Sequence, residues 1–236
     1  MRFGPVPVDE ALGGIVAHAV RQGGLVLKKG TRIGVAEIAA LKSAGVASVT
    51  VAQAEPGDVG EDEAAARIAA AVAGEGVRID PAFTGRANLF ASEAGVLVVA
   101  RDGVDRINRI DEAITLATLP AFATVEPGEM VATVKIIPYA APGDRVAEAC
   151  AGPPLVRVAP FVRRRVAVIS TLLPGLADKV IEKTLRVTAD RLAPAGAAIS
   201  VERRIPHEAA ALTKALAELV PQSDLVLVFG ASAIAD

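Results

Sequence analysis

The clearest hydrophobic pattern in the chain lies in its last third, from about residue 161. Apolar runs at 165–170 and 224–229 and the strand-like "AAISVERRI" alternate with two amphipathic stretches, "LADKVIEKTLRVTADRL" and "PHEAAALTKALAELV". Such alternation is typical of parallel sheets, whose crossovers are right-handed and place helices on both faces. We therefore predict three parallel strands and two crossover helices in residues 161–236.

The preceding 160 residues have shorter apolar runs and more frequent turn signals. Residues 8–22 place apolar side chains at helical spacing, and "VAEIAALKSAG" predicts a helix that ends at Gly45 before the strand "VASVTVA". An acidic "EPGDVGEDE" loop precedes an Ala-rich helix, after which β-branched runs are broken by turns at "RDG" and "EPGE". This region is expected to be mixed α and β, with many short strands.

These shifts of pattern divide the chain into three expected units. We place an N-terminal α+β unit at 1–55, a strand-rich middle unit at 56–160 and an α/β unit at 161–236. The expected fold class is α/β, with mixed α+β N-terminal and middle regions followed by a three-layer αβα domain with parallel strands. A chain of 236 residues with 52% hydrophobic content can bury a core for each of one or two domains.

Charge and composition exclude several classes of partner. Lys and Arg number 25 against 27 Asp and Glu, so there is no basic field to recruit nucleic acid or an anionic membrane. Aromatic residues make up 3%, which leaves little for base stacking. The single cysteine, Cys150, can form neither an internal disulfide nor a cysteine metal cluster. With no signal-peptide pattern and no apolar run near ~20 residues, we predict a cytoplasmic protein without nucleic-acid or membrane partners.

The candidate chemistry lies where the predicted parallel strands end. The segments after Ser170 and Phe229 meet at one carboxyl edge, which is where open α/β sheets bind ligands. Thr171 and Ser232 offer hydroxyl groups there, and Gly230 lets backbone amides approach a phosphate. The same Gly-Ala-Ser turn can equally be a tight connection with no ligand. No dinucleotide fingerprint, P-loop lysine, catalytic triad or metal cluster is visible in the sequence.

Four other polar features have a structural and a functional interpretation, and the structural one is favoured for each. His207 precedes a predicted helix, where it can contact a ligand or flank the cap. Asp111 is interpreted as a helix N-cap, and Arg86 and Asn88 lie in a turn-rich stretch. The basic run 163–165 comes before a strand, at the edge opposite the candidate site, and is interpreted as surface charge.

Several phrases resemble a family of bacterial molybdopterin-binding proteins, related to the molybdopterin molybdotransferases and gephyrin. They are "DEAITLATLPAFATVEPGEMVATVKIIPYA", "TLLPGLADKVIEKTLRVTADRL", "ERRIPHEAAAL" and "DLVLVFGASAIAD", and the first 53 residues are similar to the opening of the same group. The resemblance implies a role in molybdenum cofactor biosynthesis. A molybdopterin-binding-like α/β domain would hold a pterin phosphate at Thr171, Gly230, Ser232 and Asp236. It also implies a homo-oligomer, because the molybdotransferases build their sites across domains and subunits.

The departures from the family are as informative as the matches. Where molybdotransferases have a Thr-Gly-Asp-Glu type loop, Thr171 is followed by "LLPGLADK", and Phe229 and Ile234 replace the outer glycines of a Gly-Gly-x-Ser-x-Gly loop. Metal insertion is therefore in doubt, and neither molybdate nor Mg²⁺ has a visible motif. Family members usually continue past "GASAIAD", so we expect this α/β domain to be incomplete, cut after its ligand loop.

Two functions remain open from the sequence. The first is a molybdopterin-binding module of cofactor biosynthesis, with transferase activity undecided. The second is a non-catalytic scaffold or regulatory domain that docks to a fused or separate nucleotidyltransferase. An open crevice around Thr171, Gly230 and Ser232 would favour binding, whereas packing of these residues by a neighbouring element would favour the scaffold.

Overall fold

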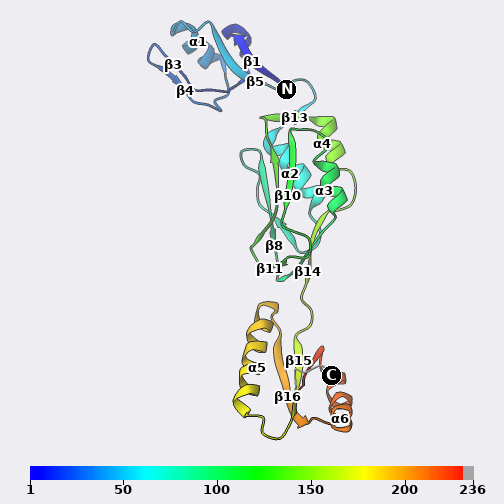
Figure 1. Ribbon diagram of the computed structural model, residues 1–236. Helices are drawn as coiled ribbons and strands as arrows, with labels where there is room; N and C mark the ends of the chain where they lie inside the picture. The colour runs from blue at the N-terminus through cyan, green and yellow to red at the C-terminus, as the bar shows by residue number, and fades with distance from the viewer. Residues whose placement is uncertain (231–236) are drawn as a thin grey trace. The chain divides into compact units, whose positions relative to one another are not determined.

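The computed structural model describes residues 1–230 and has a mixed α/β fold with six α-helices in that range. The chain forms two compact units. The first comprises residues 1–91, 97–123 and 129–157, and the second comprises 92–96, 124–128 and the described residues from Val158 onward. Figure 1 labels the helices and those strands for which there is room. The three-way division at residues 55 and 160 stays a prediction.

Residues 2–53 of the first unit hold a small antiparallel sheet with its own core. The strand order is β1-β5-β2, with a separate β3–β4 hairpin. The core contains the fully buried Val16, Ile33, Leu41 and Val51. The elements are β1 (Arg2–Pro7), the 3₁₀ turn η1 (Val8–Glu10), β2 (Ile15–Val16), β3 (Val20–Gln22), β4 (Leu25–Leu27), α1 (Val35–Ser43) and β5 (Ser48–Gln53). The predicted helix before Gly45 and the strand after it are both confirmed.

The helix predicted over residues 8–22 is wrong. The structure has η1, β2 and β3 in its place. Gly13 takes a φ of +77°, and a Cβ at Gly14 would lie 3.0 Å from the Ala11 carbonyl oxygen and from Val51 Cβ. The glycine pair therefore turns the chain closely onto β5, and the apolar spacing that imitates a helix serves the packing of two short strands.

The rest of the first unit is built around a four-stranded antiparallel sheet in the order β10-β12-β8-β7. The predicted Ala-rich helix, α2, packs on β8 and β12. A two-stranded β13-β6 pair lies beside α2. The sheet in the order β11-β9-β14 includes residues of the second unit, to which all of β11 belongs. The elements from residue 58 to 160 are β6 (Asp58–Gly60), α2 (Glu61–Val72), β7 (Val77–Ile79), β8 (Arg86–Ala91), β9 (Gly95–Val99), α3 (Arg101–Ile107), β10 (Ile114–Thr118), β11 (Thr124–Val125), β12 (Met130–Ile136), β13 (Ala140–Pro142), α4 (Gly143–Ala149) and β14 (Val156–Pro160).

The "RDG" turn predicted in this region is wrong, because these residues begin helix α3. Gly103 is tolerated in the helix for a packing reason. A Cβ at Gly103 would lie 2.3 Å from Leu155 Cδ2, so the glycine allows α3 to approach that side chain closely. The "EPGE" segment does form a turn, between β11 and β12.

Two further local interpretations need correction. Arg86 and Asn88 lie in strand β8 rather than in a turn-rich stretch, and the Thr133 hydroxyl donates to Asn88 Oδ1 at 2.8 Å. Asp111 does not cap a helix. Its Oδ1 accepts from the Ala113 amide at 2.8 Å, which forms a local side-chain turn ahead of strand β10. An aspartate satisfies free amides equally well in either setting, so its sequence position alone could not separate them.

The second unit confirms the predicted parallel sheet. Strands β16 and β17 both pair parallel with the central β15. The elements are β15 (Arg165–Leu172), α5 (Asp178–Leu192), the 3₁₀ turn η2 (Ala193–Ala195), β16 (Ala198–Pro206), α6 (Ala209–Leu219), the 3₁₀ turn η3 (Val220–Gln222) and β17 (Leu225–Phe229).

The two helices cover opposite faces of this sheet, which gives three layers (Figure 1). Ala167 and Ile169 of β15 pack in one cluster with Leu219 of α6. Val166 and Val168 pack in another cluster, with Leu185 of α5. Successive residues of a strand point to opposite faces, so both faces of β15 must be apolar, as its continuous apolar run requires. In residues 1–230, no helix has both the length and the hydropathy to cross a bilayer.

Candidate ligand site at the carboxyl edge of the parallel sheet

The crossovers of the second unit create a crevice at the carboxyl ends of two neighbouring strands. The chain leaves β15 for α5 on one face and leaves β16 for α6 on the other. Where the connections of adjacent parallel strands diverge in this way, a depression opens beyond the strand ends, and open α/β folds bind ligands in such crevices. The local sequence therefore determines the position of the crevice through the order of its strands and helices.

A pocket of about 460 Å³ occupies this position, within the size range of small-molecule sites. It is lined by Leu172, Leu173, Pro174, Arg204, Ile205, Pro206, His207 and Glu208. The lining residues come from the ends of β15 and β16 and from the segments that follow them. Apolar side chains thus form a wall, and one guanidinium, one imidazole and one carboxylate provide the polar groups.

Thr171 and His207 connect the three strand ends. Thr171 Oγ1 lies 2.8 Å from His207 Nδ1 and donates to the Phe229 carbonyl oxygen at 3.3 Å. A hydroxyl has one proton, so when it is donated to Phe229, Nδ1–H of His207 must donate to the hydroxyl. In the neutral imidazole this leaves Nε2 as a hydrogen-bond acceptor. His207 therefore does more than flank a cap, since it links β16 to β15 while Glu208 occupies the N-cap of α6.

Arg204 brings a positive charge to the pocket that is already partly balanced. Its Nε donates to Glu202 at 2.7 Å and its Nη1 donates to Asp178 at 3.1 Å. The hydrogen bond to Glu202 raises the pKa of Arg204 above its ordinary value. In residues 1–230, the carboxylate of Glu208 has no hydrogen bond or ion pair. The pocket therefore combines a fixed guanidinium with a carboxylate that is free to accept from a ligand.

The four predicted site residues differ in where they lie. Thr171 was expected in the loop after Ser170, but β15 continues to Leu172, and Thr171 is a strand residue with 5% exposure. Gly230 follows β17 directly and is exposed. Ser232 and Asp236 lie outside the described residues. The pairing Ser170↔Phe229 places Thr171 and Gly230 at the ends of adjacent strands. Ligand binding by these four residues stays a prediction.

Sequence reasoning missed Arg204 and Glu208, which line the pocket. The signal lay in "ERRIPHE", where a strand ends in charged residues beside a proline. Only the register of β16 against β15, with Thr171 opposite Ile205, shows that this end of the strand faces the same crevice. The charge spacing alone is equally typical of a solvated edge strand.

The amino edge of the same sheet carries a different kind of polar group. Asp224 Oδ2 accepts from the backbone amides of Arg164 and Arg165 at 2.9 and 2.8 Å, and Oδ1 accepts from the Arg165 guanidinium at 2.9 Å. The Arg165 side chain, followed by the two amides, lowers the pKa of Asp224 below its ordinary value. Arg165 is exposed as predicted, but it is an ordered partner of Asp224 rather than a free surface charge.

Residues 1–230 contain no cluster of three or more His, Cys, Asp or Glu side chains arranged to hold a metal ion. At the candidate pocket, two lining residues are of a metal-ligating type, the sequence neighbours His207 and Glu208. The described part of the chain therefore gives no geometry from which a molybdate or Mg²⁺ step can be derived.

A family model described as a domain of unknown function, DUF8806, matches residues 5–53. No curated protein matches the chain. A search of solved structures finds the crystal structure of the molybdopterin biosynthesis MoeA protein from Pyrococcus horikosii, with 13% identity and a TM-score of 0.21 over 97% of this chain. The chain spans 59% of that protein, and a TM-score of 0.21 is too low to support an argument about fold or function.

Proposed function

We propose that the αβα unit binds molybdopterin at the carboxyl edge of its parallel sheet and acts in this way in molybdenum cofactor biosynthesis. The observation that carries the proposal is the pocket between the diverging connections of β15 and β16. The exposed Gly230 follows β17, which pairs with the other edge of β15. The sequence resemblance to molybdopterin-binding proteins supports the choice of ligand. A cytoplasmic location, a homo-oligomeric state and a transferase reaction belong to the same proposal.

The pocket residues suit the parts of a pterin phosphate. The planar ring would lie on the apolar wall that includes Leu173 and Pro174. The carboxylate of Glu208 can accept from the ring's N–H and amino groups, and Nε2 of His207 can serve a second polar atom. These side chains would bind and orient the ring, because each offers hydrogen-bonding capacity that the described part of the protein leaves unused.

The phosphate calls for donors other than Arg204 alone, because Glu202 and Asp178 already balance that guanidinium. The backbone amides that follow β17 are suitable, since Gly230 has no side chain to obstruct them. Ser232 would add a hydroxyl donor. In this proposal the anion is held mainly by the loop after Phe229, and Arg204 provides a weaker second contact.

The test is isothermal titration of molybdopterin into the wild-type chain and the Ser232→Ala variant. Losing one hydrogen bond to a charged group costs roughly 1.5–3 kcal/mol, so the affinity should fall about tenfold to a hundredfold. Ser43→Ala, at an exposed serine in α1, is a matched control that should bind like the wild type. Gly230→Val should abolish binding, because a branched side chain obstructs the amides. Unchanged affinity in folded Ser232→Ala and Gly230→Val would remove this loop from the site.

One observation favours the scaffold alternative. Thr171 is buried and its hydroxyl is engaged by His207 and Phe229, which is the packed arrangement rather than an open one. A scaffold domain would dock to a nucleotidyltransferase through this edge without binding the pterin. A wild-type chain that is folded but binds no molybdopterin at millimolar concentration would support this alternative over the binding proposal.

A further inference from the structure

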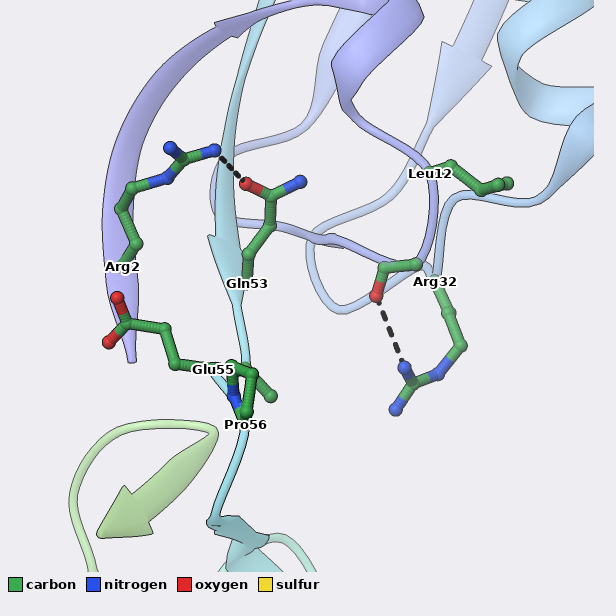
Figure 2. Close-up of a pocket in the computed structure, with 8 residues that line it drawn as sticks. Arg2, Leu12, Arg32, Gln53, Glu55 and Pro56 are labelled. Carbon is green, nitrogen blue, oxygen red and sulfur yellow. Dashed lines mark hydrogen bonds between the residues drawn. The ribbon is translucent and has the colours of Figure 1, made fainter.

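A second pocket, remote in sequence from the first, lies in the N-terminal region at the end of strand β5 (Figure 2). Its volume is about 470 Å³. It is lined by Arg2, Leu12, Gly13, Arg32, Gln53, Ala54, Glu55 and Pro56. Two guanidinium groups thus border one small pocket, and the proposed molybdopterin site uses neither of them.

Arg2 is held in place by a neutral side chain. It begins β1 and pairs across the sheet with Gln53 of β5. Its Nη2 donates to Gln53 Oε1 at 2.8 Å, and Gln53 Nε2 donates in turn to the Glu10 carbonyl oxygen at 2.7 Å. Figure 2 shows the Arg2 guanidinium directed toward Gln53. The glutamine therefore fixes the direction of the guanidinium without neutralising its charge.

Arg32 is held by the backbone on the other side of β5. It forms an isolated bridge with Ile15 of β2, the strand that pairs with β5. Its Nη1 donates to the Gly13 carbonyl oxygen at 3.1 Å, as the dashed line in Figure 2 shows. The acceptor is again a neutral oxygen. Both guanidinium groups are thus oriented by hydrogen bonds that leave their charge uncompensated.

The pocket keeps an excess of positive charge. In residues 1–230, neither Arg2 nor Arg32 forms an ion pair. The carboxylate of Glu55, the one acidic group that lines the pocket, contacts the α-ammonium of Met1 at 2.8 Å, and Asp58 contacts the same ammonium at 2.9 Å. A guanidinium has five N–H donors, and each of these two spends one on the neutral acceptors named above. The remaining donors are suited to the oxygens of a phosphate or carboxylate.

We propose that this pocket binds a small organic oxyanion, whose phosphate or carboxylate head contacts Arg2 and Arg32 and whose apolar body lies on Leu12. Leu12 has 58% exposure, and Ala54 and Pro56 extend the apolar lining. The volume accommodates a ligand of small-metabolite size. Residues 5–53 match a domain of unknown function, so this inference gives that region a binding role independent of the pterin proposal.

The experiment titrates phenyl phosphate, benzoate and uncharged benzyl alcohol into the full chain, followed by backbone amide NMR shifts. Phenyl phosphate or benzoate should shift amides around residues 2, 13, 32 and 53, and benzyl alcohol should not. Whichever anion binds more tightly identifies the head group. Removing charge-assisted hydrogen bonds from one guanidinium should weaken binding about tenfold or more in Arg2→Gln and in Arg32→Gln. Arg21→Gln, at an exposed arginine of β3 outside the pocket, makes the same charge change and should bind like the wild type.

Gln53→Glu tests most directly whether anion binding depends on the uncompensated charge of Arg2. It keeps the size of the side chain and the acceptor for Arg2, but it removes the donor to the Glu10 carbonyl and places a carboxylate against the Arg2 guanidinium. The resulting ion pair should reduce anion binding about tenfold or more while the fold, checked by thermal melting, is kept. Gln53→Met removes the acceptor without adding charge and should have a smaller effect.

Three results would overturn the proposal: neither anion shifts these amides at ~10 mM, Arg21→Gln weakens binding as much as the pocket variants, or folded Gln53→Glu binds like the wild type. The pterin proposal is tested separately, because Gly230→Val should leave phenyl phosphate binding at residues 2–56 intact.

Discussion

The two ends of the parallel sheet in the second unit differ in how their polar groups are satisfied. At the amino end, one carboxylate, Asp224, accepts two backbone amides and a guanidinium, and it ties the start of β15 to the segment before β17. At the carboxyl end, the connections of β15 and β16 diverge around a pocket, Glu208 has capacity for a partner and Gly230 is exposed. One end is closed by the protein's own groups, and the other leaves polar groups with unused hydrogen-bonding capacity.

The difference shows how one three-stranded sheet can have a closed edge and an edge with unused polar groups. The same three strands run to both edges, so the buried residues in their middle support the two edges equally. At the amino end the carboxylate of Asp224 is used by contacts within the protein, whereas at the carboxyl end the carboxylate of Glu208 is not. Thr171 is the intermediate case, because it lies at the carboxyl end but its hydroxyl is used inside the protein.

The largest effect is expected at Ile169, in the middle of β15. Its side chain is fully buried in the cluster with Ala215 and Leu219 of α6. Ile169→Ala should lower the free energy of unfolding by about 2–5 kcal/mol, because the lost contacts leave a cavity. Urea denaturation measures this, with Val162→Ala at an exposed position as a control that should stay within about 0.5 kcal/mol. A change of similar size at both positions would contradict the assigned core.

A smaller loss of stability is expected at Thr171. Thr171→Val keeps the shape but removes the hydroxyl, which leaves the Phe229 carbonyl and His207 Nδ1 without this partner. The free energy of unfolding should fall by about 1–2 kcal/mol. Thr171→Ser keeps the hydroxyl and should recover part of the loss. If the valine variant is as stable as the wild type in urea denaturation, the three strand ends are not held together by this hydroxyl.

At the amino end the expected effect depends on pH. The pKa of Asp224 is lowered from its ordinary value of 3.8, so its ionised form stabilises the fold above that value, and this contribution is lost as the pH falls toward the lower folded pKa. Asp224→Asn should be less stable than the wild type near neutral pH. The difference should narrow as the pH falls below about 4.

Thermal melting of both proteins across this range measures the effect. Asp190→Asn, at an exposed carboxylate of α5, is the control and should run parallel to the wild type at every pH. A difference between Asp224→Asn and the wild type that is the same at acid and neutral pH would show that Asp224 acts through shape rather than charge.

The smallest effect is expected at Asp178, and it has opposite signs for stability and binding. This exposed residue pairs with Arg204 and lies in the first turn of α5, so Asp178→Asn should cost at most about 1 kcal/mol of stability. Because the substitution releases part of the Arg204 charge, molybdopterin affinity should rise about twofold to fivefold. Titration calorimetry measures the change, with Asp190→Asn as a control. Weaker binding in Asp178→Asn would argue against an anion beside Arg204.

Elements with a strong hydrophobic periodicity were predicted correctly. Predictions were wrong where one sequence pattern fits two different local structures. The continuous apolar run of β15 and the amphipathic α5 and α6 gave strand, helices and parallel pairing correctly. The prediction for residues 8–22 was wrong because the apolar spacing of a helix also fits a 3₁₀ turn and two short strands, with Gly13 and Gly14 turning the chain between η1 and β2. Asp111 failed because a carboxylate accepts amides in a turn as readily as at a helix start.

The sequence by itself determined the order of strands and helices in the second unit, and with it the edge where connections diverge, because side-chain periodicity and crossover handedness are local properties. Only the tertiary structure decided which groups meet at that edge. Thr171 is turned inward to His207 and Phe229, while Arg204 and Glu208 line the pocket. The same holds for Arg2 and Arg32, thirty residues apart, which border one pocket because β5 pairs with both β1 and β2. Register between distant segments depends on the packing of the whole sheet, which no short stretch of sequence encodes.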